Sequence, residues 1–389
     1  MKPDLHVAYI VSHYPHNAFG HDGGIGTSVF TLAEKLKEFN VQVSVFVYGQ
    51  KEEFVIEEKN STIYSLNNSK GKFFNFYWNR KKIQKFINRI ILEKKIDIIE
   101  APDWTGITAF MRFKIPLVIR FHGSDAYFCH LENRKQKIKN FWFEKLAISN
   151  ADAFIAPTKF AGEISKKLFK IKGKEITTIY NGLYLDNFDN KEPDKFEENV
   201  ILYVGTLIRK KGVLELPGIF NKVRNDFSGA KLILIGGDTL DLKTKSKSTW
   251  ELMKTLFTED DLKNVNYLGK IPYGEIQNYI KKANVCVFPT YAETFGMVTT
   301  EAMAMQKAVV NSNIGWAQEL IIDGESGYLV YPSNHDKYAD RIRNIFKSSD
   351  LSLEIGKNAR QRVENKFDIN KLVKENIAFY LKVINSKSI

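Results

Sequence analysis

The chain has 389 residues, of which 44% are hydrophobic and 26% are charged, and it carries a formal net charge of +12. This length exceeds what one hydrophobic core usually supports and predicts two domains, and the composition is that of an ordinary soluble protein. No apolar run is long enough to cross a bilayer, and the two cysteines, Cys129 and Cys286, argue against a disulfide framework or a cysteine metal cluster.

Short apolar runs alternate with amphipathic stretches of helix length along the whole chain. The first run is followed at once by histidines, unlike a signal peptide, so we expect a cytoplasmic protein. The runs lack strict alternation, which is typical of parallel strands buried on both faces, and the strand–helix rhythm predicts two doubly wound α/β sheets. The predicted strands lie in residues 7–12, 41–48, 96–102, 116–123, 151–157, 176–182, 200–205, 231–237, 265–269, 283–289, 307–312 and 327–332.

The domain boundary is predicted from a polar, acidic segment with one proline, residues 187–199, which has the composition of a linker. We therefore expect an N-terminal domain over residues 1–187 and a C-terminal domain over 199–367. A last amphipathic helix within residues 368–389 follows the second sheet. Because ligands of such sheets bind beyond the carboxyl ends of the strands, we expect the two domains to face each other across a ligand-binding cleft.

A glycine turn follows the first strand. Gly23, Gly24 and Gly26 precede a helix that we expect Thr27 or Ser28 to cap. A glycine turn at a helix N-terminus is a potential anion site, but the same pattern also suits a simple turn. It is not the dinucleotide fingerprint G-x-G-x-x-G, because ten residues separate the glycines from the strand.

The excess positive charge lies in the N-terminal half, where residues 1–190 hold 28 Lys and Arg against 20 Asp and Glu. Within residues 70–95, nine basic residues accompany one acid, and Phe73, Phe74, Phe76, Tyr77 and Trp78 lead the run. Basic and aromatic residues together favour an anionic membrane surface or a polyanionic acceptor. A crossover helix with solvated lysines explains the same pattern. Nucleic acid is disfavoured, because no recognition motif accompanies the charge.

Two polar segments follow predicted strands at their carboxyl ends. The sequence RFHGSD places His122 and Asp125 after the fourth strand, although a single histidine is more often structural or solvated than functional. The sequence GTLIRKKG places Arg209, Lys210 and Lys211 after the first strand of the second domain. These cations could neutralise a diphosphate, or they could form a solvated charge run.

The most informative stretch is PTYAETFGMVTTEAMAM, residues 289–305, in which Glu293 and Glu301 flank the predicted start of a helix. The first main-chain N–H groups of a helix have no intrahelical partner, and with the helix dipole they form a site for phosphate. These groups belong to Phe295, Gly296, Met297 and Val298. Two carboxylates beside an anion site suit a nucleoside diphosphate attached to a molecule rich in hydroxyl groups.

The spacing of Glu293 and Glu301 around the F-G pair resembles the signature of the retaining glycosyltransferases of family 4. The glycine turn, the H-G-x-D element and the K-G pair at Lys211 and Gly212 are similar to further elements of that family. The family has arginine where this chain has Thr206, and we infer that Arg209 supplies the missing cation. The resemblance implies a GT-B fold of two Rossmann-like domains, with the last helix crossing back onto the N-terminal domain.

The resemblance also implies the chemistry, which is transfer of a hexosyl group from a nucleoside diphosphate sugar with retention. UDP-sugar is the preferred donor and GDP-sugar the second. The chain contains no Asp-any-Asp triplet, so we expect no metal and assign its work to fixed cations and helix amides. The implied contacts are His122 and Glu293 with the sugar, Arg209, Lys211 and residues 295–298 with the diphosphate, Glu301 with the ribose, the main chain near Leu268 with the base, and Gly24 with donor phosphates and acceptor.

The acceptor and the cellular role are inferred from the basic, aromatic stretch. It favours a glycan or lipid-linked acceptor in the synthesis of cell-surface polysaccharide or glycolipid, with peripheral binding at the inner membrane face. Two alternatives stay open. The chain could be a non-catalytic nucleotide-sugar binding subunit, or it could be a different enzyme on the same fold, such as a sugar-nucleotide epimerase or a phosphorylase.

Overall fold

The computed structural model describes residues 5–19, 23–68 and 75–387. The chain divides into two compact units, one formed by Met1–Gly182 with Ile369–Ile389 and the other by Leu183–Asp368. The segment predicted as a linker, residues 187–199, therefore belongs to the second unit. There the side chain of Asn190 donates a hydrogen bond to the carbonyl of Met305 at 3.0 Å.

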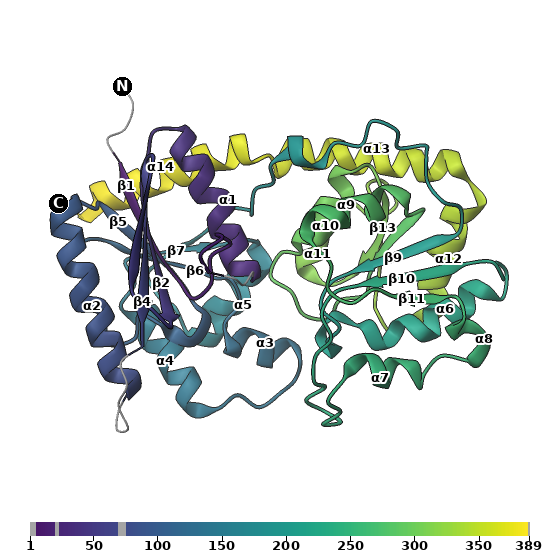
Figure 1. Ribbon diagram of the computed structural model, residues 1–389, viewed down its shortest axis with the longest axis horizontal. Helices are drawn as coiled ribbons and strands as arrows, with labels where there is room; N and C mark the ends of the chain where they lie inside the picture. The colour runs from purple at the N-terminus through teal and green to yellow at the C-terminus, as the bar shows by residue number, and fades with distance from the viewer. Residues whose placement is uncertain (1–4, 20–22, 69–74, 388–389) are drawn as a thin grey trace. The chain divides into compact units, whose positions relative to one another are not determined.

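An eight-stranded sheet forms the first unit in the order β3-β4-β2-β1-β5-β6-β7-β8, with every pair parallel except β3–β4 (Figure 1). The strands are β1 (His6–Val11), β2 (Gln42–Gln50), β3 (Phe54–Glu58), β4 (Ser61–Asn67), β5 (Ile98–Pro102), β6 (Leu117–Arg120), β7 (Ala153–Ala156) and β8 (Ile176–Thr178). The helices are α1 (Gly24–Glu38), α2 (Asn75–Lys94), α3 (Asp125–Leu131), α4 (Ile138–Ser149), α5 (Lys159–Phe169), α14 (Ile369–Lys387) and the short 3₁₀ helix η1 (Trp104–Gly106).

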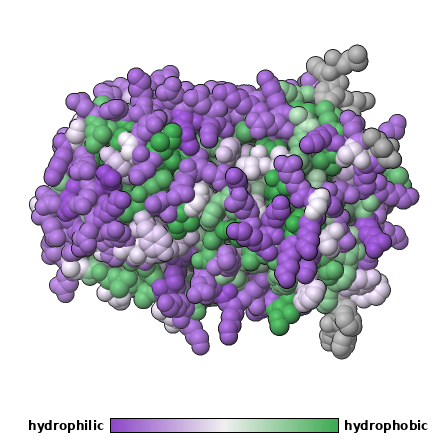
Figure 2. Space-filling model, turned by 180° about the vertical axis from the view of Figure 1, so that it is seen from behind, coloured by the Kyte–Doolittle hydropathy of each residue, from purple (hydrophilic) through white to green (hydrophobic). Residues whose placement is uncertain are grey.

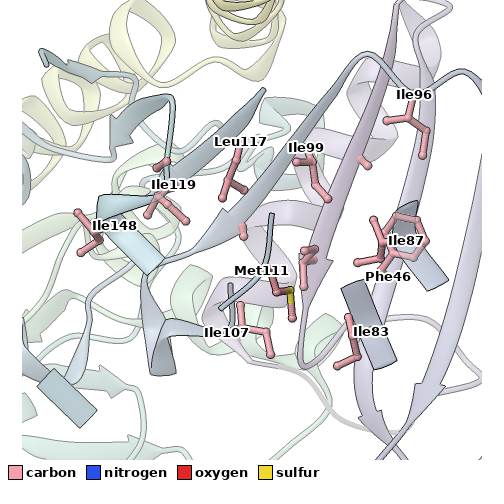
Figure 3. Packing of buried hydrophobic residues seen from close by; sticks show 14 of the residues in the cluster. Phe46, Ile83, Ile87, Ile96, Ile99, Ile107, Met111, Leu117, Ile119 and Ile148 are labelled. Carbon is pink, nitrogen blue, oxygen red and sulfur yellow. The ribbon is translucent and has the colours of Figure 1, made fainter. Parts of the chain in front are cut away.

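Alternation along the strands gives the two faces of this sheet different partners. Ile99 and Ile119 point to the face that α2 covers, where a single hydrophobic cluster forms. Figure 3 shows Ile83 and Ile87 of α2 beside Phe46 of β2 in this cluster. Because the isoleucines of α2 recur at helical spacing, one stripe of a highly basic helix is buried while its lysines stay outside.

The opposite face of the sheet carries a buried polar network that binds α14, the yellow helix of the first unit in Figure 1. The guanidinium of Arg120 donates to both carboxylate oxygens of Glu100 at 2.7 and 3.0 Å and to the side-chain oxygen of Asn376 at 2.6 Å. The hydroxyl of Tyr380 donates to Glu100 at 2.7 Å. A buried ion pair is tolerated when further hydrogen bonds satisfy it, and here α14 supplies them, so the last helix completes the first unit.

The β3–β4 hairpin was not predicted. Its two strands pair antiparallel at the edge of the sheet, and Asn60 occupies the turn with a φ of 61°. Most of β3 is exposed or half-buried, so it lacks the continuous apolar run by which a central parallel strand is recognised.

A six-stranded sheet forms the second unit in the order β11-β10-β9-β12-β13-β14, and all of its pairs are parallel. The strands are β9 (Val200–Val204), β10 (Lys231–Ile235), β11 (Val265–Tyr267), β12 (Val285–Phe288), β13 (Ala308–Ser312) and β14 (Tyr328–Val330). The helices are η2 (Leu185–Phe188), η3 (Arg209–Lys211), η4 (Val213–Glu215), α6 (Leu216–Arg224), α7 (Thr249–Lys254), α8 (Glu259–Leu262), α9 (Tyr273–Lys282), α10 (Met297–Ala304), α11 (Gly315–Leu320), α12 (His335–Lys347) and α13 (Ser349–Lys366).

The predicted fold class of two parallel α/β sheets is confirmed, and each of the twelve predicted runs overlaps a strand. Among the helices that the structure describes, none is long and apolar enough to cross a membrane. Figure 2 shows hydrophilic side chains over much of the visible face, with smaller hydrophobic areas between them.

Candidate functional site

The candidate site of the second unit lies where its strand order reverses. The strands β9 and β12 are neighbours in the sheet, but β10 and β11 extend from β9 to one side while β13 and β14 extend from β12 to the other. Ligands of open α/β sheets bind at such a switch point, beyond the carboxyl ends of the strands. The segments that follow β9 and β12, residues 205–212 and 289–301, are the two that the sequence singled out.

The two segments pack against each other through their main chains. Gly212 has a φ of +67°, and a Cβ atom there would lie 1.6 Å from the carbonyl oxygen of Pro289, so no larger residue fits. The carbonyl of Lys210 accepts hydrogen bonds from the N–H groups of Tyr291 at 2.8 Å and Ala292 at 3.2 Å. The cationic turn after β9 and the acidic loop after β12 are therefore held in a fixed relation.

This packing brings two predicted site residues together. The ammonium of Lys211 forms an ion pair with the carboxylate of Glu293, and both side chains are mostly buried. Glu293 also accepts a hydrogen bond from the N–H of Thr294 at 2.9 Å. Burial alone would raise the pKa of Glu293, but the Lys211 ammonium and the Thr294 N–H outweigh it and hold the pKa below its ordinary value. Glu293 is therefore ionised and can accept hydrogen bonds, and Lys211 is a cation beside it.

Arg209 has a partner that the sequence did not reveal. Its guanidinium donates two hydrogen bonds of 2.8 Å to the buried carboxylate of Asp241, in the loop after β10. The hydrogen bonds from Arg209 hold the pKa of Asp241 well below its usual range. At Thr206, where the family has arginine, the carbonyl accepts a hydrogen bond from the hydroxyl of Tyr203 at 3.1 Å. Arg209 is thus a positioned cation whose charge Asp241 largely neutralises.

The helix that follows the acidic loop is α10. It begins at Met297, with Gly296 before it at a φ of 97°, where a Cβ atom would lie 2.9 Å from the ring of Trp316. The first amide to bond within the turn is that of Thr299, which donates to the carbonyl of Gly296 at 3.0 Å. The amides of Met297 and Val298 lie ahead of it, at the positive end of the helix, where an anion is favoured.

Phe295 anchors the loop that leads into α10. Its side chain is 1% exposed, and its ring packs edge-on against the ring of Phe367 at 5.5 Å. The phenylalanine of the F-G pair therefore contributes packing, and any contact of this residue with a ligand would come from its main chain.

Glu301 lies in α10 and is 4% exposed. Its carboxylate accepts a hydrogen bond of 2.7 Å from the hydroxyl of Tyr273, at the start of α9. Burial raises the pKa of Glu301 to about 7, although the Tyr273 hydroxyl lowers it in part. Tyr273 was missed at the sequence level. It lies in the segment IPYGE, where a single tyrosine after a proline gives no signal of its own.

The main chain near Leu268 is partly engaged within the sheet. The N–H of Leu268 donates to Leu234 at 3.0 Å, and the carbonyl of Gly269 accepts from the N–H of Gly236 at 2.9 Å. These bonds fix the end of β11 beside the end of β10, so a contact with a base would use the remaining main-chain groups.

A second tie joins the cationic turn to the acidic loop. Glu215, in η4, accepts a hydrogen bond from the hydroxyl of Tyr291 at 2.9 Å and contacts the imidazole of His335 at 2.7 Å. Sequence analysis gave His335 no role. Tyr291 lies 76 positions and His335 lies 120 positions from Glu215, so no local sequence pattern connects them.

The remaining predicted site residues, His122 and Gly24, belong to the first unit. His122 lies two residues after the end of β6, and its N–H donates to the carboxylate of Asp103 at 2.9 Å. Burial and the nearby Arg120 guanidinium lower the pKa of His122 to about 3, so its imidazole is neutral at physiological pH. It can take part in hydrogen bonds but brings no charge.

The glycine turn differs from the expectation in one respect. The helix α1 begins at Gly24 with Gly23 before it, so the prediction that Thr27 or Ser28 caps the helix is wrong. A Cβ atom at Gly26 would lie 2.4 Å from the carbonyl oxygen of His13, so packing requires glycine there. At Gly24 no heavy atom of a described residue elsewhere in the chain lies within 4 Å of the corresponding position, which leaves room there beside the described residues.

Two family profiles match the chain, Glycosyltransferase Family 4 over residues 22–187 and Glycosyl transferases group 1 over residues 186–362. An uncharacterised glycosyltransferase of Methanocaldococcus jannaschii is 27% identical over 365 residues, which cover 92% of this chain and 94% of that protein.

Two solved structures show the same arrangement of strands and helices. Sucrose-phosphate synthase of Thermosynechococcus elongatus has a TM-score of 0.80 at 21% identity, covering 98% of this chain and 100% of that one. HepE of Anabaena, in complex with UDP and glucose, has a TM-score of 0.70 at 19% identity, covering 96% of this chain and 99% of that one. These similarities show a GT-B-like fold. With the two profiles together spanning residues 22 to 362, the chain belongs to the family 4, or group 1, glycosyltransferases.

Proposed function

We propose that this chain is a retaining glycosyltransferase that moves a hexosyl group from a UDP-sugar, with GDP-sugar as the second choice, to a glycan or lipid-linked acceptor. The observation that carries the proposal is the Lys211–Glu293 ion pair, beside the N-terminus of α10 and at the switch point of the second sheet. The preference for UDP is supported by HepE, which has the same fold and was solved with UDP and glucose.

In this proposal the diphosphate is stabilised by fixed positive charge. As the bond between the sugar and the diphosphate breaks, negative charge grows on the departing oxygens, and positioned cations and amides lower the energy of that state. Lys211, Arg209 and the amides of Met297 and Val298 are the groups assigned to this task. The donor has to compete with Glu293 for Lys211 and with Asp241 for Arg209, so binding exchanges one set of charged partners for another.

The sugar and the nucleoside are assigned to the carboxylates. Glu293 would accept hydrogen bonds from sugar hydroxyls once the diphosphate takes over Lys211, and Glu301 with Tyr273 would bind the ribose hydroxyls. His122, with a neutral imidazole, would form a hydrogen bond to the sugar, and Gly24 leaves space for phosphate or acceptor. Retention of configuration is carried over from the family.

Two other functions are distinguished by simple measurements. A non-catalytic nucleotide-sugar binding subunit would bind the donor in calorimetry but release no nucleotide with any acceptor. An epimerase would change the sugar and leave the nucleotide attached. A panel of nucleoside diphosphate sugars, screened for thermal stabilisation, identifies the donor to use in these assays.

The first prediction concerns the ion pair. Lys211→Ala or Glu293→Ala is expected to lower turnover of the donor that the thermal screen identifies by well over tenfold. This loss corresponds to about 1.4 kcal/mol or more of transition-state stabilisation. Circular dichroism should show that the fold is intact. Lys282→Ala, which removes an exposed cation that pairs with Glu197 in the same unit, is the matched control and should keep the normal rate. Near-normal turnover in both site variants would remove the assignment.

The second prediction concerns metal. Because fixed cations and helix amides are assigned the task that a divalent ion performs elsewhere, turnover should be unchanged after dialysis against EDTA and after addition of Mg²⁺ or Mn²⁺. A loss of activity with EDTA that Mg²⁺ restores would contradict the metal-independent mechanism.

The acceptor assignment is supported by the outer face of α2. A stripe at helical spacing presents Trp78 and Leu92, which are 61% and 69% exposed, with exposed Lys82, Lys85 and Arg89 between them. Lysine and arginine between exposed apolar residues suit an anionic lipid surface. We therefore place the protein in the cytoplasm and at the inner membrane face. Phe73 and Phe74, which contributed to this hypothesis, lie outside the described residues.

The third prediction tests that surface. Lys85→Glu combined with Arg89→Glu should abolish co-sedimentation with vesicles that contain anionic phospholipid, because the charge complementarity is reversed. Lys166→Glu combined with Lys167→Glu changes the charge equally, on the exposed face of α5 in the same unit, and should leave co-sedimentation intact. Equal binding by both double variants, or no binding by the unaltered chain, would reject the membrane surface.

A further inference from the structure

We propose that Glu144 is a positioning residue for the transfer reaction, because its buried carboxylate fixes residues 122–126 and thereby the direction of the His122 imidazole. The inference rests on the proposed function, in which His122 forms a hydrogen bond to the transferred sugar. No motif pointed to Glu144, which lies in the sequence FWFEKLAIS of α4.

The first observation is the set of bonds that Glu144 makes. Its side chain is completely buried, and it accepts hydrogen bonds from the N–H groups of Asp125 at 2.7 Å and Ala126 at 3.1 Å. A third hydrogen bond comes from the side-chain amide of Gln136 at 2.9 Å. Glu144 thus caps the first turn of α3 from a different helix. The helix has only seven residues, so it depends on such external bonds.

The position of Glu144 is itself fixed by a close approach of two backbones. Gly106 has a φ of +55°, and a Cβ atom there would lie 2.3 Å from the main chain of Phe143. The guanidinium of Arg80 donates to the carbonyl of Gly106 at 3.2 and 3.4 Å and lies over the ring of Phe143 at 4.8 Å. The turn after β5 and the middle of α4 are therefore held in direct contact, which brings the Glu144 carboxylate to α3.

A second buried carboxylate holds the other end of the same segment. Asp103, at the end of β5, is completely buried and accepts a hydrogen bond from the N–H of His122 at 2.9 Å. Its second oxygen has no hydrogen-bond partner among the described residues. Between these two anchors, Ser124 accepts a hydrogen bond from the N–H of Tyr127 at 3.1 Å. The main chain from His122 to Ala126 is thus held by carboxylates on both sides.

The bonds from Glu144 stabilise α3, but stability alone does not account for two neighbouring buried acids. Burial raises the pKa of Glu144 to about 7, and burial together with Glu144 raises the pKa of Asp103 well above its usual value. Two buried acids this close together are costly to ionise, because burial and their mutual repulsion both favour the neutral forms. Buried acids with strongly perturbed pKa values are typical of functional sites.

The role proposed for His122 requires that its imidazole point in a fixed direction. The neutral imidazole contributes one directed hydrogen bond, and such a bond helps a transition state only when its atoms are placed to within a fraction of an ångström. The segment 122–126 follows a strand end. Asn140 and Arg134 bind the side chain of Asp125, whereas Asp103 and Glu144 bind the main chain of the segment. Carboxylate anchors to main-chain N–H groups restrain it without using the imidazole itself.

The test compares three variants in the full chain. Glu144→Ala removes both acceptor oxygens, and Glu144→Gln keeps the size of the side chain but replaces one acceptor with an NH₂ group that faces other donors. Glu163→Gln, on the exposed face of α5, is the control. The measurements are hydrogen exchange by mass spectrometry over residues 122–131, UDP binding by calorimetry, and turnover of UDP-glucose by release of UDP.

Glu144→Gln is expected to exchange at least tenfold faster over residues 122–131 and to lower kcat more than tenfold. UDP affinity should stay within twofold, because the assigned UDP contacts other than Gly24 lie in the other unit. Glu144→Ala should show the same pattern more strongly. If Glu144→Ala does not fold, the Glu144→Gln variant alone tests the inference. Normal kcat with a loosened segment, or unchanged exchange, overturns the inference. If the unaltered chain releases no nucleotide from any donor of the panel, the proposed function is overturned. Hydrogen exchange over residues 122–131 then shows by itself whether Glu144 holds the segment.

Discussion

The contact between the Lys211 ammonium and the Glu293 carboxylate is the interaction on which the site of the second unit depends. It exists because Gly212 lets the turn after β9 lie directly against Pro289 at the end of β12. Each charge is the partner of the other, and their attraction offsets the free-energy cost of burying two charges. A ligand that brings both a diphosphate and hydroxyl groups can replace both partners at once, whereas a simple anion replaces only one.

The two units hold groups at their strand ends by different interactions. At the strand ends of the second unit, charged side chains and the amides of α10 surround the place assigned to the diphosphate. At the strand ends of the first unit, buried Asp103 and Glu144 bind main-chain N–H groups and hold a neutral histidine. In both, the groups are fixed before any ligand arrives, and such preorganised dipoles and charges are the usual source of transition-state stabilisation.

Much of the fold could be predicted from the sequence because buried parallel strands leave a local signature. The β3–β4 hairpin escaped because edge strands lack that signature. The motif around Glu293 and Glu301 is also local, so its residues could be named in advance. The partners Asp241, Tyr273 and Glu144 could not, because each contact joins residues 19 to 32 positions apart through the tertiary fold. The assigned roles of the site residues remain predictions, and the pairing of Arg209 with Asp241 qualifies its assignment to the diphosphate.

The central claim, that Lys211 binds the diphosphate once Glu293 releases it, is tested most directly by the affinity for UDP without sugar. Calorimetry should be carried out on the unaltered chain, Lys211→Met and Glu293→Gln. The account predicts that Lys211→Met weakens UDP binding more than tenfold, because the cation is lost. It predicts that Glu293→Gln strengthens UDP binding, because the competing carboxylate is gone and UDP has no sugar for it to bind. Unchanged affinity in Lys211→Met, or weaker binding in Glu293→Gln, would contradict it.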